Sequence, residues 1–439
     1  MRIDIAATVD RNPIGLLQVR VVVLCGLVAL LDGFDLQTMA IVTPRIAAEW
    51  ALPFPEFSRA LSASLAGILL GALIGGLLGD HYGRRRSILI AFLWMGLMSL
   101  LTATATSVMH LAVFRLLTGV GLGACLPNII ALTTEYIPER RRTIAVALMF
   151  CGVPLGGGLG SYLATDLVAA YGWRSVFITG GILPLAIEVI LWFALPESIR
   201  FLAMRKERKG QVIRTLQGID TAYQASPADE FVVPERTANS TSVQQLFADG
   251  RSTSTIILWA VFFCNLFEFY FLLSWLPSFL TKAGWPRDAV GFGTSLLQLG
   301  GIVGALPFAL LTDRFSVERV LLPVYLFGAV AVAAVGNLHQ SVAITQLTIA
   351  LTGAAVVGSQ FCLNALAASI YPTDARSTGV GWALGIGRFG AVVSPLIGGA
   401  FIAAHWPQER IFALLSVPAL LCAVGVTLLR HARRSIKAQ

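Results

Sequence analysis

Residues 76–86 of the 439-residue chain read Gly-Leu-Leu-Gly-Asp-His-Tyr-Gly-Arg-Arg-Arg. This stretch separates two apolar runs, residues 58–79 and 87–107, and each run is long enough to cross a bilayer as a helix. A carboxylate, a tight glycine turn and three arginines are therefore expected in a short loop at one membrane surface. The rest of the sequence repeats this plan of apolar runs joined by short polar loops.

The composition indicates a protein of the bilayer. Only 13% of the residues are charged and 56% are hydrophobic, whereas a typical soluble domain carries about 25% charge. We therefore expect an all-α membrane protein with twelve transmembrane helices, which we place at residues 21–43, 58–79, 87–107, 110–133, 143–165, 175–195, 253–280, 288–311, 319–337, 342–367, 377–403 and 409–430.

The net charge of +8 reflects orientation in the membrane. With the N-terminus in the cytoplasm, most of the 32 Lys and Arg fall on cytoplasmic segments, which is the bias that sets membrane topology. We therefore expect both termini to be cytoplasmic, membrane lipid to surround the chain, and no nucleic-acid partner. The first apolar run is too long for a signal peptide and is expected to stay attached.

The chain is expected to have two related halves. Hydropathy collapses after Pro196, which predicts a domain at 1–198, a cytoplasmic linker at 199–251 with a short amphipathic helix near 205–217, and a second domain at 252–439. Matching residues recur in order at a nearly constant spacing: Gly71–Leu73 with Asp80 and Arg86 against Gly304–Leu306 with Asp313 and Arg319, Leu117–Gly119 against Leu351–Gly353, and Pro138 with Arg142 against Pro372 with Arg376. Parallel repeats of this kind are typical of transporters that rock two bundles about a midplane site.

Asp32 and Asp35 are the most informative charges. They lie three residues apart in an apolar run, where each ionised carboxylate costs roughly 2.5–3.5 kcal/mol on insertion scales. Their spacing puts both on one helical face. They could be structural partners of basic residues, ligands of a cation, or proton carriers, and proton coupling is favoured because two close carboxylates resist double ionisation. The sequence does not distinguish which of the two holds the proton.

Residues 76–86 resemble the signature Gly-x-x-x-Asp-Arg-x-Gly-Arg-Arg of the major facilitator superfamily, with His81 in place of the first arginine. Further resemblances are Arg115-x-x-x-Gly-x-Gly and Pro196-Glu-Ser-x-Arg, and a degenerate second loop contains Asp313 and Arg314. The resemblance implies the twelve-helix fold with two six-helix pseudo-repeats. Asp80 in such a loop can act as a latch that pairs with the opposite bundle in one conformation only. We expect a gating network of Asp80, Arg84, Arg85, Glu135, Arg142, Asp313, Arg314 and Arg376.

Within the superfamily the sequence resembles the aromatic acid:proton symporter family. The resemblance is carried by Asp32-Gly-Phe-Asp35, by Gly123–Asn128, and by Tyr371–Gly381 continuing to Gly387-Arg388-Phe-Gly390. It implies proton-coupled uptake of an aromatic carboxylic acid, hydroxyphenylpropionate- or hydroxybenzoate-like, across the bacterial inner membrane. Protons are then the coupling ion, with no other cofactor, and the chain is expected to act as a monomer.

Three further residues are expected at the substrate site or in a charge relay. Arg388 lies near the middle of an apolar helix, where its planar fork can hold a substrate carboxylate or pair with an aspartate of the other half. Arg115 cannot discard its charge and serves either gating or anion attraction. Asn128 belongs to the family pattern. Glu268 also lies in mid-helix, but no motif requires it.

Other functions remain alternatives. A symporter of another organic acid or of a sugar, or a drug:proton exporter, would share the same superfamily signatures. A sugar porter is expected to carry Pro-Glu-Thr after the last helix, where this chain has Leu429-Arg430-His431. An enzyme is not expected, because the sequence has no nucleophile motif, phosphate-binding loop or cluster of metal ligands, and its six cysteines fall singly in predicted helices.

Overall fold

The computed structural model describes residues 2–220, 223, 230–232, 243–248, 250–337, 341–372 and 375–438. Twelve helical spans in this part of the chain are long and apolar enough to cross a membrane, which confirms the predicted fold class. They are α2 (Leu16–Trp50), α3 (Ser58–Tyr82), α4 (Arg84–Thr102), α5 (Val108–Tyr136), α6 (Arg142–Phe150) with α7 (Gly152–Tyr171), α8 (Arg174–Ala194), α11 (Ser252–Lys282), α12 (Arg287–Arg314), α13 (Val317–Val335), α14 (Val342–Ile370), α15 (Arg376–Ala403) and α16 (Gln408–Ala438).

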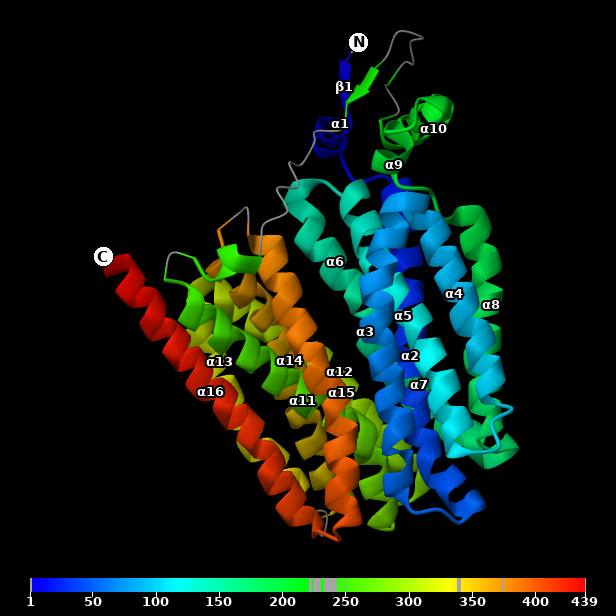
Figure 1. Cartoon of the computed structure of the whole chain (residues 1–439), viewed down its shortest axis with the longest axis vertical. Coiled ribbons are helices and arrows are strands. Elements are labelled where there is room, and N and C mark those ends of the chain that lie inside the picture. Colours follow the sequence, from blue (N-terminus) through cyan, green and yellow to red (C-terminus); the bar gives the residue numbers. More distant parts are fainter. Residues whose placement is uncertain are drawn as a thin grey trace.

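Most of these helices run past the predicted limits. The first span covers Leu16–Trp50 instead of residues 21–43. Hydropathy marks only the part of a helix that lies in hydrocarbon, whereas backbone hydrogen bonding continues into the polar surface region. Figure 1 shows α2–α8 in one bundle and α11–α16 in another, which we call the N-bundle and the C-bundle.

Glycines spaced four apart bring α2 and α7 into close contact. Gly152, Gly156 and Gly160 of α7 face α2, and a Cβ at Gly152 would lie 2.5 Å from the carbonyl oxygen of Gly26. Gly33, between the two aspartates, faces the backbone of Val153 at a distance that leaves no room for a side chain. Such small residues permit close helix approach in membranes. The glycine between Asp32 and Asp35 is therefore required by packing.

The fifth span is bent. The sequence predicts one helix over 143–165 that Pro154 can bend, and the structure ends α6 at Phe150 and begins α7 at Gly152. Proline lacks the N–H that would bond the carbonyl four residues earlier, and its ring crowds that carbonyl. The break therefore lies just before Pro154, as expected of a proline-induced kink.

The linker and the N-terminal segment form a small assembly at one end of the N-bundle (Figure 1). It consists of β1 (Arg2–Asp4), α1 (Ile5–Arg11), α9 (Ile199–Ala203), α10 (Lys209–Ile219) and β2 (Glu230–Val232). β1 and β2 pair in parallel, which the sequence does not predict because strands this short show no periodicity. Helix α10 matches the expected amphipathic helix, displaced by a few residues. Apolar side chains of α1, α9 and α10 join the apolar core of the N-bundle.

The two bundles contact each other at the end away from the linker. A Cβ at Gly399 of α15 would lie 2.7 Å from Cβ of Ser58 of α3, and Ser295 of α12 donates a hydrogen bond to the Gly158 carbonyl of α7 at 2.6 Å. Buried apolar side chains of both bundles form one cluster there. We call this the closed end and the opposite one the linker end.

At the linker end the bundles diverge (Figure 1). Gly76 follows Ser58 by five full turns of α3, and Gly381 precedes Gly399 by five full turns of α15, so each pair shares a helix face. A Cβ at Gly76 or Gly381 would meet no atom within 4 Å, in contrast to Gly399. The faces that touch at the closed end are therefore apart at the linker end.

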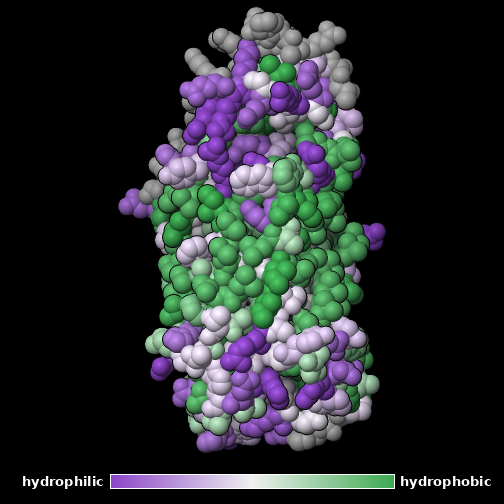
Figure 2. Space-filling model, turned by 90° about the vertical axis from the view of Figure 1, so that its right-hand side faces the viewer, coloured by the Kyte–Doolittle hydropathy of each residue, from purple (hydrophilic) through white to green (hydrophobic). Residues whose placement is uncertain are grey.

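The surface of the N-bundle matches a bilayer. Figure 2 shows a hydrophobic band around its middle with hydrophilic residues above and below. Exposed Leu, Ile, Val and Phe side chains are numerous on these helices, as expected where lipid replaces water as the solvent. The chain is therefore a multi-pass membrane protein.

Neighbouring glycines of α3 provide a test of this packing. Gly75→Ala places a methyl group against the backbone of Ala124, whereas Gly76→Ala meets open space. We expect Gly75→Ala to destabilise the protein by about 1–3 kcal/mol through overpacking. We expect Gly76→Ala to be neutral or slightly stabilising, because alanine favours helix over glycine. Thermal unfolding of the purified proteins in detergent measures both, and equal melting temperatures would contradict the packing.

Candidate functional site

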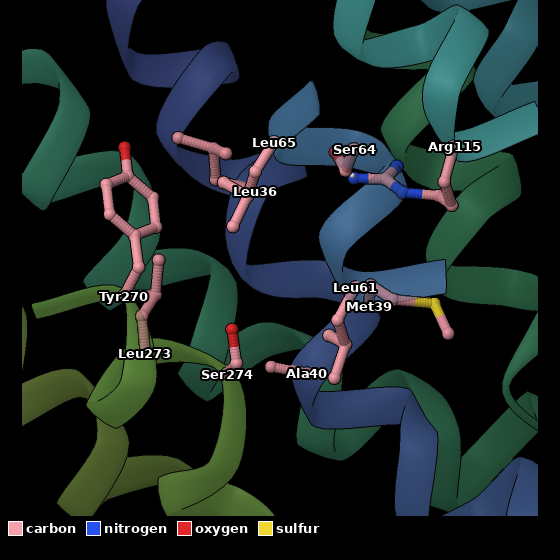
Figure 3. A pocket seen from close by; sticks show the side chains of 10 residues that line it. All are labelled: Leu36, Met39, Ala40, Leu61, Ser64, Leu65, Arg115, Tyr270, Leu273 and Ser274. Atoms are coloured by element: carbon pink, nitrogen blue, oxygen red, sulfur yellow. Dashed lines mark hydrogen bonds between the residues drawn. The ribbon is translucent and has the colours of Figure 1, made fainter. Parts of the chain in front are cut away.

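A small cavity lies between the two bundles, with about 10 Å³ of free volume, which is room for roughly one water molecule in this conformation. Figure 3 shows the side chains that line it, which come from α2, α3 and α5 of the N-bundle and from α11 of the C-bundle. Its lining residues are Leu36, Met39, Ala40, Leu61, Ser64, Leu65, Arg115, Tyr270, Leu273 and Ser274. A mostly apolar cavity with a few polar groups is typical of a site for a small organic ligand.

Asp35 forms a buried ion pair with Arg115. Two guanidinium nitrogens donate to its two carboxylate oxygens at 2.8 and 2.7 Å, and a further donation reaches the Asp35 carbonyl at 3.1 Å. Arg115 also donates to the Ser64 hydroxyl at 3.2 Å, toward which it points in Figure 3. The side chains are 1% and 0% exposed. In this bidentate geometry each group replaces solvation that the other has lost on burial.

Asp32 has no such partner. It is 4% exposed, and its Oδ1 atom has no hydrogen bond to any described residue. Arg388 of α15 lies within electrostatic reach of Asp32 but not in ion-pair contact. Tyr270, which lines the cavity, is within electrostatic reach of both groups. An unpaired carboxyl inside a bundle is stable there as the neutral acid.

Arg388 is the cation near Asp32 that remains free to bind a ligand. It is half-buried and makes no hydrogen bond or ion pair with the residues that the structure describes. A guanidinium cannot lose its proton, so it needs water or an anionic ligand beside it. The structure therefore separates the four central charges into a closed pair, Asp35 with Arg115, and an open pair, Asp32 with Arg388.

Asn128 lies away from the cavity, between α5 and α3. Its amide nitrogen donates to the carbonyls of Gly75 and Ala124 at 2.8 and 2.9 Å, and its oxygen accepts from Arg84 at 3.5 Å. The side chain is fully buried. Its hydrogen bonds join the two helices and the loop arginine, and Asn128 does not line the cavity.

The structure brings Asp80, Arg84 and Glu135 together at the linker end. Arg84 bonds Asp80, and its Nε lies 4.0 Å from Glu135. Glu135 also accepts from the Ser198 hydroxyl. Asp80 remains 69% exposed, and its partner lies in the same bundle. The expected contact of Asp80 with the opposite bundle is absent here because the bundles are apart at this end.

Glu197 completes this network, and it belongs to the Pro196-Glu-Ser pattern, for which the sequence predicts a cytoplasmic gate contact. Its carboxylate accepts from the backbone N–H of Arg85 at 2.9 Å, and its carbonyl accepts from the Tyr136 hydroxyl at 2.7 Å. The Arg85 guanidinium bonds the carbonyl of Trp192. The Pro196-Glu-Ser pattern places this carboxylate at the same membrane surface as the arginines.

Arg142, Arg314 and Arg376 form no ion pair between the bundles with any residue that the structure describes. Arg142 lies 4.0 Å from Asp10 of α1, and it donates to the carbonyl of Ile137 at 3.1 Å. Arg314 and Arg376 are exposed at the linker end of α12 and α15, without an ion pair to a described residue. Asp313 lies in the last turn of α12, and its side chain is outside the described part of the structure.

Two pseudo-symmetric helical bundles around a central cavity with buried charges define a secondary transporter. A family model of the Major Facilitator Superfamily matches residues 25–286 and 258–439. The chain is 38% identical to a gallate transporter of Pseudomonas putida, over 98% of this chain and 96% of the relative. It is 37% identical to a 4-hydroxybenzoate transporter of Pseudomonas aeruginosa, over 97% and 96%.

A third relative is a 3-(3-hydroxy-phenyl)propionate transporter of Escherichia coli, 35% identical over 94% of each chain. Among solved structures, a D-xylose-proton symporter superposes with a TM-score of 0.72 at 17% identity, covering 93% of this chain and 97% of that one, and shares the fold. The chain belongs to the Major Facilitator Superfamily and, within it, to the aromatic acid:proton symporter family. It is a transporter and not an enzyme.

The buried pair makes a prediction about stability. Asp35→Asn or Arg115→Gln alone leaves one buried charge without its partner, which costs about 3–5 kcal/mol. The double variant should recover much of this loss, because no charge is left unpaired. Thermal unfolding in detergent measures the three proteins. Glu49→Gln is the control, since it breaks the exposed pair with Arg174, where about 1 kcal/mol or less is expected. If the single variants were as stable as this control, Asp35 and Arg115 would not form a buried ion pair.

Proposed function

We propose that the protein takes up an aromatic carboxylic acid together with protons by alternating access. The observation that carries the proposal is the open pair, since a cation and a carboxyl without partners among the described residues lie within electrostatic reach of each other and of Tyr270, which lines the cavity. The relatives support the substrate class, because their names specify gallate, 4-hydroxybenzoate and 3-(3-hydroxy-phenyl)propionate. All three are aromatic acids with ring hydroxyl groups.

Arg388 binds the substrate carboxylate in this proposal. Its planar guanidinium can form two parallel hydrogen bonds with a carboxylate, and Arg115 cannot do so while it is paired with Asp35. The aromatic ring lies against the apolar wall of Leu36, Leu65 and Tyr270. The hydroxyls of Ser64 and Ser274 are positioned to bond the polar substituents of the ring.

Asp32 carries the coupling proton, and Asp35 stays ionised. Protonated Asp32 leaves the positive charge of Arg388 free for the substrate, whereas ionised Asp32 competes with the substrate for that charge. Proton release and carboxylate release therefore favour each other. A bare monoanion entering against an inside-negative potential costs about 2.3 kcal/mol per 100 mV, and one proton cancels that charge.

The linker end faces the cytoplasm in this proposal, so the structure is the inward-facing state. The members of the gating network that belong to the N-bundle then form one side of the cytoplasmic gate. Arg314, Arg376 and Asp313 form the other side, on the C-bundle. The domain limits are 1–198 and 252–439 with the linker at 199–251, both termini are cytoplasmic, and the chain acts as a monomer in the bacterial inner membrane. No nucleic acid and no cofactor other than protons take part.

Proton coupling predicts that uptake depends on external pH. Proteoliposomes loaded with the protein should accumulate labelled 4-hydroxybenzoate faster when the outside is acidic, because a carboxyl must be protonated before the bundles rock. A protonophore should abolish accumulation above equilibrium. Uptake unaffected by both treatments would refute the coupling.

Substrate binding by Arg388 predicts a selective loss of affinity. Arg388→Ala should raise the KM for 4-hydroxybenzoate by about tenfold to a hundredfold, which corresponds to charge-assisted hydrogen bonds of about 1.5–3 kcal/mol. The melting temperature should change little, because Arg388 bonds no described residue. Arg174→Ala, at the closed end, is the control variant. A normal KM in Arg388→Ala would remove Arg388 from the site.

A further inference from the structure

Glu268 is a buried carboxyl that the proposed transport cycle does not use. It lies in the middle of α11 and is 1% exposed. Neither carboxylate oxygen has a hydrogen-bond partner in the described part of the structure. An isolated carboxylate in such a place costs several kcal/mol more than the neutral acid. Intramembrane acids without a structural partner are therefore candidates for ion or proton binding.

Within the described part of the chain, no positively charged group acts on Glu268. The titratable groups around it are the thiol of Cys264 on its own helix, the thiol of Cys422 on α16 and the phenol of Tyr325 on α13. The hydroxyl of Tyr325 is also buried and lies beside the Ser359 side chain. An unpartnered carboxyl and a phenol thus lie in one apolar core, in the C-bundle and on the other side of α11 from the helix α15.

A chain of polar side chains leads from this place to a more open one. Asn265, three residues before Glu268, donates to the Gln360 side chain at 2.7 Å, and Gln360 donates to Asn364 at 3.0 Å. Ser359 donates to Asn265 at 3.1 Å. Asn265 is buried, whereas Gln360 and Asn364 are partly exposed. Amides at membrane depth face protein or water. This chain of amides begins at Asn265, one turn of α11 before Glu268, and extends to the partly exposed Gln360 and Asn364.

We propose that Glu268 is a second proton-binding site of the transporter, located in the C-bundle and reached along Asn265, Gln360 and Asn364. The carboxyl takes up one proton per cycle at one side of the membrane and releases the same proton at the other. No bond other than the O–H bond forms or breaks. Each bundle then contributes one protonatable carboxyl, Asp32 in the first and Glu268 in the second.

This inference rests on the proposed proton-coupled uptake and specifies how many protons accompany each substrate. With two carboxyls exchanging protons, at least two protons accompany each monoanionic substrate, so that the substrate enters with net positive charge. Transport then draws on the membrane potential as well as on the pH gradient. A single coupling carboxyl would give an electrically neutral cycle.

The test is the proton-to-substrate ratio, measured from the reversal potential of labelled 4-hydroxybenzoate flux in proteoliposomes. We expect a ratio of two or more for the unaltered protein and a ratio lower by one for Glu268→Gln, which keeps the shape of the neutral acid. Glu188→Gln is the control, because Glu188 is a half-buried membrane carboxyl on α8 and should leave the ratio unchanged. A ratio of one in the unaltered protein, or an equal ratio in Glu268→Gln, would overturn the proposal.

Infrared spectroscopy tests the proposal even if a variant folds but does not transport. The C=O stretch of protonated carboxyls is recorded on the purified protein across a pH titration, with and without 4-hydroxybenzoate. Glu268→Gln should lose one band that Asp32→Asn retains. An unchanged spectrum in Glu268→Gln would also overturn the proposal. If the unaltered protein showed uptake independent of protons, the proposed function would fail first, and the ratio would be zero in every variant.

Discussion

The ion pair between Asp35 and Arg115 determines how the other charges at the centre can behave. In the membrane interior each charge needs a partner or water, because an unpaired buried ion costs several kcal/mol. This pair satisfies both carboxylate oxygens of the aspartate and the two terminal nitrogens of the arginine, with the Ser64 hydroxyl as an additional acceptor. The arginine Nε has no hydrogen-bond partner among the described residues. Asp32 and Arg388 remain free to bind a proton and a substrate carboxylate, which are released in each transport cycle. A site that binds both a proton and a carboxylate needs this division.

The arrangement of small residues allows the site to open at one end at a time. Ser58 and Gly399 touch at the closed end, while the faces of Gly76 and Gly381 are free at the linker end. Because each pair shares a helix face, rocking of rigid bundles can exchange one contact for the other without local unfolding. The pairing of Arg84 with Asp80 and Glu135 within one bundle fits the separated state, because these charges satisfy one another when the opposite bundle is distant.

Much of the fold could be predicted from the sequence because its signals are local. Apolar runs predict helices one at a time, and the repeated motifs relate the two halves. Charges in apolar runs identify Asp32, Asp35, Arg115 and Arg388 without any structure. Their pairing could not be predicted, because it depends on how α2, α5 and α15 are placed in space. The sequence alone does not show that Arg115 pairs with Asp35 and not with Asp32.

Other features were missed for the same reason. The β1–β2 pairing joins segments more than two hundred residues apart and too short to show periodicity. Asn128 belongs to a family pattern, but only the structure shows that its amide binds the backbone of α3. Glu268 is visible as a charge in the sequence, whereas its lack of a partner is a property of the packed C-bundle.

The central claim is that Asp32 carries a proton while Asp35 only balances Arg115. The most direct measurement compares substrate exchange with proton-driven accumulation for Asp32→Asn in proteoliposomes. Exchange of internal and external 4-hydroxybenzoate needs substrate binding and rocking but no net proton movement. We predict that Asp32→Asn retains exchange but accumulates less substrate from the same pH gradient, because one proton fewer is coupled to each substrate. Accumulation at the level of the unaltered protein would contradict the account.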